Sequence, residues 1–172
     1  LHVVQLAGRD PAWMQRAAAQ LADNGTDIID INMGCPAKKV VGGLSGSALM
    51  REPDLALRIV EATVAGAGSV PVTLKMRLGW DRESINAPEL AAAAEAAGVA
   101  MITVHGRTRS DFYEGQADWP AIAAVRAAVS VPLVANGDLV SPGQITAMLA
   151  RSGADAVMVG RGSQGRPWLP GL

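Results

Sequence analysis

Six short apolar runs rich in β-branched residues constrain the fold more than any other feature of the sequence. They cover His2–Ala7, Asp27–Asn32, Val70–Met76, Ala100–His105, Val131–Ala135 and Asp155–Val159. The stretches between them have helical spacing and carry helix starts at Asp10-Pro11, Glu52-Pro53, Asp118-Trp119-Pro120 and Ser141-Pro142. Successive runs start roughly 24 to 43 residues apart, the spacing of parallel strands joined by crossover helices. The sequence therefore predicts an α/β fold.

The polarity of the strand residues favours one of the two main parallel architectures. In the run that ends near Arg77, the residues Thr73, Lys75 and Arg77 share one face, and the residues between them are apolar. A doubly wound sheet favours apolar residues on both faces, whereas a barrel can hold polar residues towards its interior. A TIM barrel needs eight strands and typically ~250 residues. We therefore expect an incomplete (β/α)8 TIM barrel of about six units, with the doubly wound sheet as the alternative.

Composition and charge exclude several classes of protein. The 172 residues include 15 Lys and Arg against 16 Asp and Glu, and 49% of them are hydrophobic. This balance is typical of a globular chain and gives no overall attraction to nucleic acid or membranes, so any basic site must be local. No apolar run approaches the ~18 residues of a membrane span, and no signal peptide is evident. With Cys35 as the single cysteine, we expect a cytoplasmic protein without a disulfide or a metal site.

Polar residues and glycines stand at the ends of all six predicted strands. Because parallel strands place their carboxyl ends on one face of a barrel, we expect these residues to meet at one mouth. The last two strands end in glycine-containing segments, 136–138 and 160–162, the second of which includes Arg161. Barrel enzymes commonly hold a phosphate on the loops after these strands, so the segments predict a phosphorylated cofactor or substrate. The alternative is that the glycines only form tight turns.

Cys35 follows a strand directly, in a turn between Gly34 and Pro36. A buried, inert thiol is the usual role of a single cysteine. In this turn it could instead act as a nucleophile, helped by Lys38 and Lys39, or as a general acid, because an ordinary thiol is mostly protonated at pH 7. Spacing alone does not decide between these roles.

Basic residues gather in the segments after the strands, whereas most acidic residues lie on the helices. The basic residues are Lys38, Lys39, Arg77, Arg82, Arg107 and Arg109, and we expect all of them in loops. A positive mouth suits a polyanionic substrate, and Phe112 and Tyr113 could stack on its bases. The alternative is a solvated basic rim with two aromatic side chains that anchor a loop.

Four segments together resemble one enzyme family. They are residues 32–40 (Asn-Met-Gly-Cys-Pro-Ala-Lys-Lys-Val), 105–109 (His-Gly-Arg-Thr-Arg), 136–138 (Asn-Gly-Asp) and 160–168 (Gly-Arg-Gly-Ser-Gln-Gly-Arg-Pro-Trp). The chain resembles the tRNA-dihydrouridine synthases, above all the bacterial B type, from Val4 to its end and in the correct order. Other flavin barrels share parts of the phosphate segments, but Asn-x-Gly-Cys-Pro is far more specific.

The resemblance implies an FMN-dependent reductase that adds hydrogen across the C5–C6 bond of uridines in tRNA, with NADPH as the reductant of the flavin. It implies that the flavin passes hydride to C6 while Cys35 protonates C5 from the opposite face. The implied cofactor contacts are Gln5, Lys75, His105, Asn136, Gly137, Asp138, Gly160 and Arg161. Asn32, Arg77 and Arg107 match positions near the substrate, and Lys38 and Lys39 are further candidates for contacts with tRNA.

Two parts of the family pattern have no counterpart in the sequence, namely the first two barrel strands and the C-terminal helical domain that binds tRNA. We therefore expect residues 1–172 to form a partial FMN-binding TIM-barrel catalytic domain, strands three to eight, with two unpaired edges. Two alternatives remain open. One is a different FMN barrel, such as a dihydroorotate-type dehydrogenase, and the other is a non-catalytic barrel fragment that binds RNA or a partner.

Overall fold

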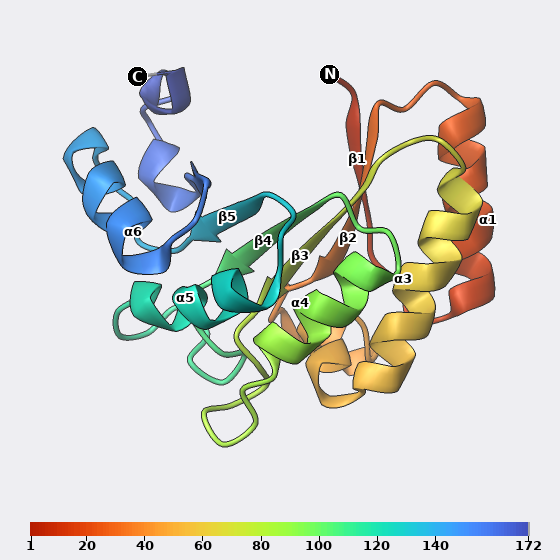
Figure 1. Cartoon of the computed structure of the whole chain (residues 1–172), viewed down its shortest axis with the longest axis horizontal. Helices are drawn as coiled ribbons and strands as arrows, with labels where there is room; N and C mark the ends of the chain where they lie inside the picture. The colour runs from red at the N-terminus through yellow and green to blue at the C-terminus, as the bar shows by residue number, and fades with distance from the viewer. Residues whose placement is uncertain (172) are drawn as a thin grey trace.

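Six parallel strands form one sheet whose spatial order follows the order of the chain. The computed structural model describes residues 1–171. The strands are β1 (Val3–Leu6), β2 (Ile28–Met33), β3 (Val72–Arg77), β4 (Met101–His105), β5 (Leu133–Asn136) and β6 (Ala156–Met158). A doubly wound sheet reverses its strand order at a switch point, whereas here each strand pairs with the next along the chain (Figure 1). The sheet is six successive strands of an incomplete TIM barrel, as the sequence predicts.

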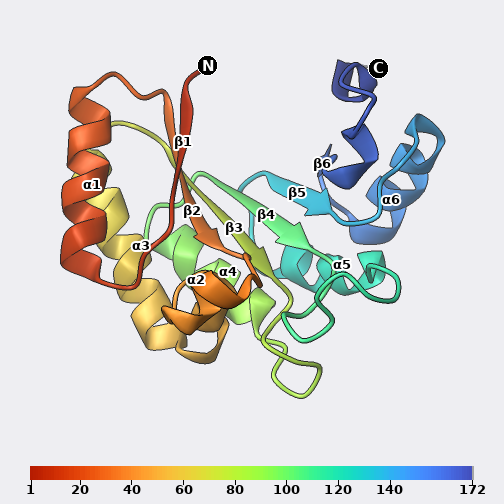
Figure 2. The same cartoon turned by 180° about the vertical axis from the view of Figure 1, so that it is seen from behind.

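Helices connect the strands, and the longer helices cover one face of the sheet. They are α1 (Pro11–Asp23), α2 (Lys38–Gly42), α3 (Pro53–Ala67), α4 (Ala87–Ala96), α5 (Trp119–Ala128) and α6 (Ile145–Ser152). The longer helices lie over the face of the sheet towards the viewer in Figure 1, and Figure 2 shows the strands from the opposite side. None of the helices in residues 1–171 combines the length and the apolar character that crossing a membrane requires.

The predicted helix starts are confirmed with one difference in detail. The Asp10 carboxylate accepts hydrogen bonds from the first backbone N–H groups of α1, and Asp118 does the same for α5, so both satisfy groups that would otherwise lack partners. At Ser141-Pro142 the chain first forms a 3-10 turn, and α6 begins only at Ile145. The difference arises because the Gln144 Oε1 accepts from the Ser141 N–H at 3.1 Å and closes this tight turn first.

The segment between β2 and β3 holds more structure than the sequence predicts. Besides α3 it contains α2 and a 3-10 segment at Gly46–Arg51, which accounts for the longest interval between strands. The structure also corrects the expected place of Arg77. This residue ends β3 rather than lying in a loop, because it pairs in register with His105 on β4.

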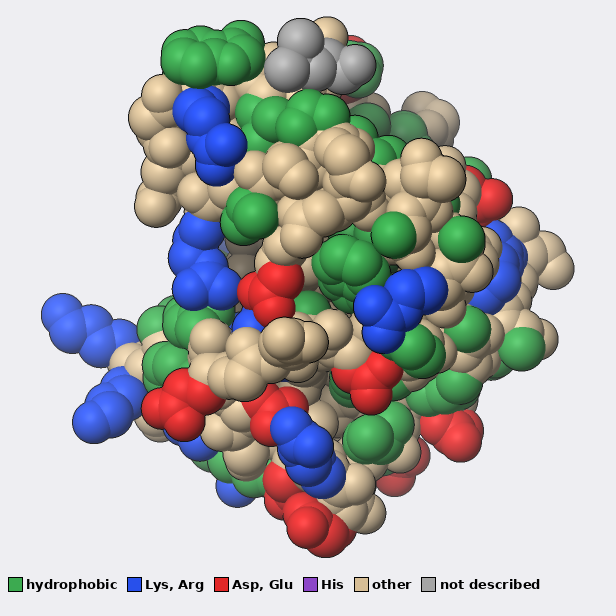
Figure 3. Space-filling model, turned by 90° about the vertical axis from the view of Figure 1, so that its left-hand side faces the viewer, with side chains coloured by type: hydrophobic (Ala, Val, Ile, Leu, Met, Phe, Trp, Pro, Cys, Tyr) green, Lys and Arg blue, Asp and Glu red, His purple; other side chains and the backbone are tan. Residues whose placement is uncertain are grey.

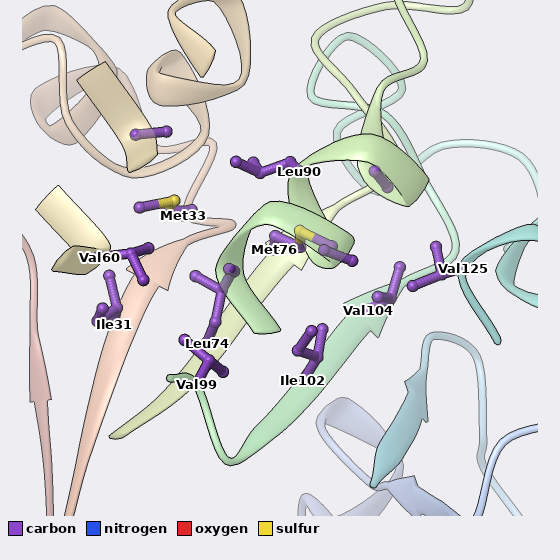
Figure 4. Close-up of a cluster of buried hydrophobic side chains, with 14 of the residues drawn as sticks. Ile31, Met33, Val60, Leu74, Met76, Leu90, Val99, Ile102, Val104 and Val125 are labelled. Carbon is purple, nitrogen blue, oxygen red and sulfur yellow. The ribbon is translucent and has the colours of Figure 1, made fainter. Parts of the chain in front are cut away.

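The core fills the space between the sheet and its helices. Alternate strand residues point towards the helices, and Figure 4 shows Ile31, Met33, Leu74, Met76, Ile102 and Val104 gathered there with side chains of α3, α4 and α5. Each of these six is fully buried, which is worth roughly 1.5–3 kcal/mol apiece. The expected alternation of apolar and polar faces is confirmed, since the core occupies only one face of the sheet.

Candidate active site

The carboxyl ends of the strands surround a pocket of about 670 Å³. Its lining includes most of the residues expected from the sequence, namely Gln5, Asn32, Cys35, Lys75, Arg77, His105, Asn136, Gly137, Asp138, Gly160 and Arg161. The strand register explains why they meet. Asn32 pairs with Lys75, and His105 pairs with both Arg77 and Asn136, so these side chains share the inner face of the sheet.

A network of hydrogen bonds holds the turn that carries Cys35. The Asn32 Oδ1 accepts from the backbone N–H groups of Gly34 and Cys35 at 3.1 and 2.9 Å. The Cys35 carbonyl accepts from both the backbone N–H and the hydroxyl of Ser47. Gly46 packs against this turn with a φ of +61°, and a Cβ there would lie 2.8 Å from the Cys35 carbonyl oxygen. The partly exposed thiol therefore stands on a well-defined backbone.

Asp30 anchors this network, although its role was not predicted from the sequence. Its carboxylate accepts from the Gln5 Nε2 and from the Thr73 hydroxyl, both at 2.6 Å. The Gln5 Oε1 in turn accepts from the Asn32 Nδ2 at 2.8 Å. Burial raises the pKa of Asp30, although its hydrogen bonds with Gln5 and Thr73 oppose the rise. The signal was available, because Asp30 is two residues from Asn32 on the same strand and so shares its face.

Lys75 provides a positive charge within the pocket. Burial, followed by the nearby charge of Arg77, lowers the pKa of its ammonium group. None of the residues 1–171 accepts a hydrogen bond from this group or forms an ion pair with it. Its three N–H donors are thus available to a bound molecule.

Arg77 joins the cysteine turn to the loop after β4. Its side chain is buried, and its Nε donates to the Gly34 carbonyl at 2.9 Å. Its Nη1 donates to the carbonyls of Thr108 and Phe112 at 2.7 and 2.8 Å. Its guanidinium carbon also lies 5.5 Å from the centre of the Tyr113 ring. Tyr113 belongs to the pocket wall, which agrees with the expected place of this loop at the mouth.

The segments after β5 and β6 form the far side of the pocket, and two of their glycines are required by packing. A Cβ on Gly137, whose φ is +120°, would lie 2.9 Å from the Cδ2 of His105, and one on Gly162 would lie 2.2 Å from the Leu139 carbonyl oxygen. Of the three glycines in residues 136–138 and 160–162, Gly160 alone has open space around an added Cβ. The guanidinium of Arg161 is 4.9 Å from the centre of the Tyr113 ring.

Three of the expected residues do not line the pocket. Lys38 and Lys39 are exposed at the start of α2 and not in a loop as expected. Arg107 lies behind the pocket wall with its side chain 2% exposed, and its contacts are all within the chain.

Lysine and arginine side chains also project from the face of the molecule in Figure 3, where acidic side chains lie among them. Within residues 1–171, no cluster of three or more His, Cys, Asp or Glu side chains is suited to a metal ion.

Comparison with known proteins identifies the family. A sequence model described as dihydrouridine synthase (Dus) matches residues 1–171. The chain belongs to the dihydrouridine synthase family. The resemblance expected from the four sequence segments is therefore confirmed.

Relatives within the dihydrouridine synthases match almost the whole chain. A protein of Rhizobium leguminosarum bv. phaseoli named probable tRNA-dihydrouridine synthase is 65% identical over 171 residues, which cover 99% of this chain and 54% of that protein. The tRNA-dihydrouridine synthase B of Xanthomonas axonopodis pv. citri is 51% identical over 168 residues, 98% of this chain and 50% of that protein. The chain spans about half the length of the curated relatives it matches.

A solved structure supports the fold. The 6-hydroxypseudooxynicotine amine oxidase of Pseudomonas geniculata superposes with a TM-score of 0.69 at 17% sequence identity. The match covers 94% of this chain and 27% of the oxidase. At this level of identity the similarity concerns the fold alone.

Proposed function

We propose that this chain forms the FMN-binding and catalytic part of an enzyme that reduces uridine in tRNA to 5,6-dihydrouridine. The observation that carries the proposal is the position of Cys35, whose turn borders the same pocket as Lys75 and the glycine-containing segments after β5 and β6. A proton donor and a cofactor site within one pocket are what this reaction requires. The proposal assigns residues 1–172 to one partial barrel domain.

The pocket fits FMN in size and in chemistry. Its volume of about 670 Å³ is within the roughly 300–1,000 Å³ of small-molecule sites. Lys75 has an unpartnered cation, while Arg161 and the open space at Gly160 suit a phosphate. Gln5, Lys75 and His105 would hold the ring and ribityl parts. Asn136, Gly137, Asp138, Gly160 and Arg161 would hold the phosphate side. When bound and reduced by NADPH, FMN would supply the hydride for C6 of the uracil ring.

The side chains of this chain would supply the proton and the orientation. In the proposed step the S–H bond of Cys35 breaks and a C–H bond forms at C5 of the uracil. Asn32 keeps the turn of Cys35 in place, because its Oδ1 accepts hydrogen bonds from two backbone N–H groups of that turn. Arg77 holds the same turn from the other side through the Gly34 carbonyl. The thiol can therefore meet a fixed target without reorganisation of the loop.

The proposed substrate is tRNA, which would approach from the mouth of the pocket. Exposed basic side chains near the mouth include Lys38, Lys39 and Arg82, and these could pair with phosphates. Asn32 and Arg77 line the pocket itself and are the proposed contacts with the uridine. We also propose that Arg107 acts near the uridine from behind the pocket wall, through the groups that its guanidinium holds and not by a direct contact.

A titration of FMN into the purified chain, followed by flavin fluorescence, tests the proposed site. We expect saturable binding that Lys75→Ala and Arg161→Ala each weaken about tenfold or more, since charge-assisted hydrogen bonds are worth roughly 1.5–3 kcal/mol. Arg58→Ala, an exposed position on α3, is the matched control and should bind like the wild type. Binding that all three variants leave unchanged would contradict the assignment of this pocket.

A further inference from the structure

His105 ends β4 with one ring nitrogen against a buried arginine. Its Nε2 is 3.3 Å from the Nη1 of Arg107. A guanidinium has donors only, so Nε2 accepts this hydrogen bond and carries no proton. We propose that Arg107 is a positioning residue that holds His105 in its Nδ1–H tautomer, so that His105 presents an N–H donor to the pocket.

The surroundings of His105 keep its ring neutral. Burial first, then the positive charges of Arg77, Lys75 and Arg107, lower the pKa of His105 to about 3, and only Asp138 opposes them. A neutral imidazole carries one proton, and the hydrogen bond made by one nitrogen decides where that proton lies. In water the Nε2–H form of histidine predominates. The contact with Arg107 therefore makes Nε2 the acceptor and Nδ1 the donor, the opposite of the form that predominates in water.

The other ring nitrogen is open to the pocket. No residue in the described range 1–171 bonds the Nδ1 of His105. Three fully buried side-chain polar atoms in that range lack a partner, namely Thr26 Oγ1, Asn86 Oδ1 and Arg109 Nε. The Nδ1 of His105 also lacks a partner but is not among these buried atoms, so it is accessible from outside the protein. Since His105 lines the pocket, the Nδ1–H is available as a donor to a bound molecule.

Arg107 cannot turn away from His105, because every one of its donors is engaged. Its two Nη atoms bond the Asp138 carboxylate at 2.9 and 2.7 Å. Its Nε donates to the Glu114 carbonyl at 2.9 Å, and its Nη2 also donates to the Gly115 carbonyl at 2.7 Å. With the contact to His105, these bonds use all five N–H groups of the guanidinium.

The same bonds shape two walls of the pocket. Asp138 has a φ of +58°, an uncommon conformation outside glycine, and its carboxylate also accepts from the Ala117 N–H at 2.7 Å. Burial works to raise the pKa of Asp138, but the bonds with Arg107 and Ala117 hold it below its ordinary value. Glu114 and Gly115 directly follow Tyr113, so Arg107 ties the Tyr113 loop to the segment after β5.

A ¹⁵N NMR spectrum of the imidazole nitrogens in the purified chain at neutral pH tests the tautomer without any ligand. The chain has only two histidines, and His2→Gln identifies the signals of His105. We expect Nδ1 of His105 at the shift of a protonated nitrogen and Nε2 at that of an unprotonated one. The opposite pattern in the folded wild type would overturn the proposal.

Variants then test whether Arg107 is the cause. Arg107→Met removes every donor at this position and keeps an unbranched side chain, so we expect the Nε2–H form to appear in its spectrum. Arg58→Met is the control and should leave the spectrum unchanged. A folded Arg107→Met variant with the wild-type tautomer would refute the role of the arginine, and the wild-type spectrum still decides the tautomer if this variant does not fold.

The consequence for the cofactor rests on the proposed function. We expect Arg107→Met to weaken FMN binding about fivefold or more relative to Arg58→Met, because both the donor and the two walls lose their support. Equal affinities would contradict this part of the inference. A wild-type chain that binds no FMN would contradict the proposed function instead, whereas the spectrum would still report the tautomer.

Discussion

Asn32 shows how a single side chain at a strand end can set up a reactive group. Its Oδ1 accepts two backbone N–H bonds from the turn, and its Nδ2 donates to Gln5. The amide is therefore engaged at both ends, which fixes its orientation. Cys35 gains a defined position from this arrangement, while its thiol makes no part of the network and stays available for chemistry.

The proposed acid role of Cys35 predicts that Cys35→Ala lowers activity but leaves the affinity for FMN nearly unchanged. In the full-length protein, Cys35→Ala should lower dihydrouridine formation on unmodified tRNA by roughly 100-fold or more, the usual contribution of a general acid. FMN affinity should stay within about twofold of the wild type, since the network around the turn uses only backbone atoms of Cys35. Mass spectrometry of the tRNA product measures the activity. Turnover near the wild-type rate would rule out Cys35 as the proton donor.

His105 should make the stability of the chain depend on pH. The lowered pKa of about 3 in the folded chain lies below the ordinary value of 6.5, so the unfolded chain binds more protons between these values. This contribution to stability is complete above pH 6.5 and is lost as the pH falls towards 3. Its slope is at most about 1.4 kcal/mol per pH unit.

Urea unfolding at several pH values between 4 and 7 measures this effect. The free energy of unfolding of His105→Gln should fall less steeply with decreasing pH than that of the wild type. His2→Gln, which removes an exposed histidine, is the control and should keep the wild-type slope. Identical slopes for all three proteins would mean that His105 is not buried as a neutral ring.

At the scale of elements, helices α1 and α3 approach each other closely at a glycine. A Cβ on Gly66 of α3 would lie 2.2 Å from the Gln15 carbonyl oxygen of α1. Backbone atoms cannot yield as a flexible side chain would. The packing of these two helices over β1 and β2 therefore depends on the absence of a side chain at this position.

Gly66→Ala should destabilise the chain by about 1–3 kcal/mol, the usual cost of overpacking. Gly42→Ala is the matched control, since Gly42 also lies at the end of a helix but has nothing within 4 Å of the added Cβ. We expect that control to be neutral or slightly stabilising, because alanine reduces the freedom of the unfolded chain. Thermal unfolding compares the two variants, and equal midpoints would contradict the close approach of α1 and α3.

The positions of the strands and their buried faces were largely predictable from the sequence, because the alternation of apolar and polar residues is a local pattern. The strands lie within one or two residues of the expected runs, and the polar and apolar faces of β3 are as expected. The 3-10 segment at Gly46–Arg51 was not predicted. It is held by contacts with the Cys35 carbonyl, which no local pattern encodes.

At the scale of the whole molecule, the sheet has two open edges. Within the described chain, β1 pairs only with β2 and β6 only with β5. On β1, Val3 is 52% exposed. Unpaired strand edges with apolar residues are templates for pairing with another chain, so this chain by itself should self-associate.

Sedimentation velocity at increasing protein concentration measures this association. Val3→Lys should reduce it, because a charge on an edge strand disfavours pairing. Ile85→Lys is the control, since Ile85 is similarly exposed at 48% but lies outside the named strands. A chain that stays monomeric at all concentrations, or equal effects of both variants, would contradict association through the β1 edge.

The sequence by itself determined the α/β class, the positions of the strands, the polar inner face and the family. These properties follow from local periodicity and from short motifs, which act over a few residues. Only the tertiary structure decided that Asp30 anchors the cysteine turn, that Tyr113 and not Phe112 joins the pocket wall, and that Arg107 lies behind it. Arg107 and Asp138 are 31 residues apart, so their pairing depends on the register of neighbouring strands. The sequence pattern suggests that Arg107 contacts the substrate. In the structure Arg107 is buried and supports His105, because all the donors of its guanidinium are engaged inside the chain and none is left for a ligand.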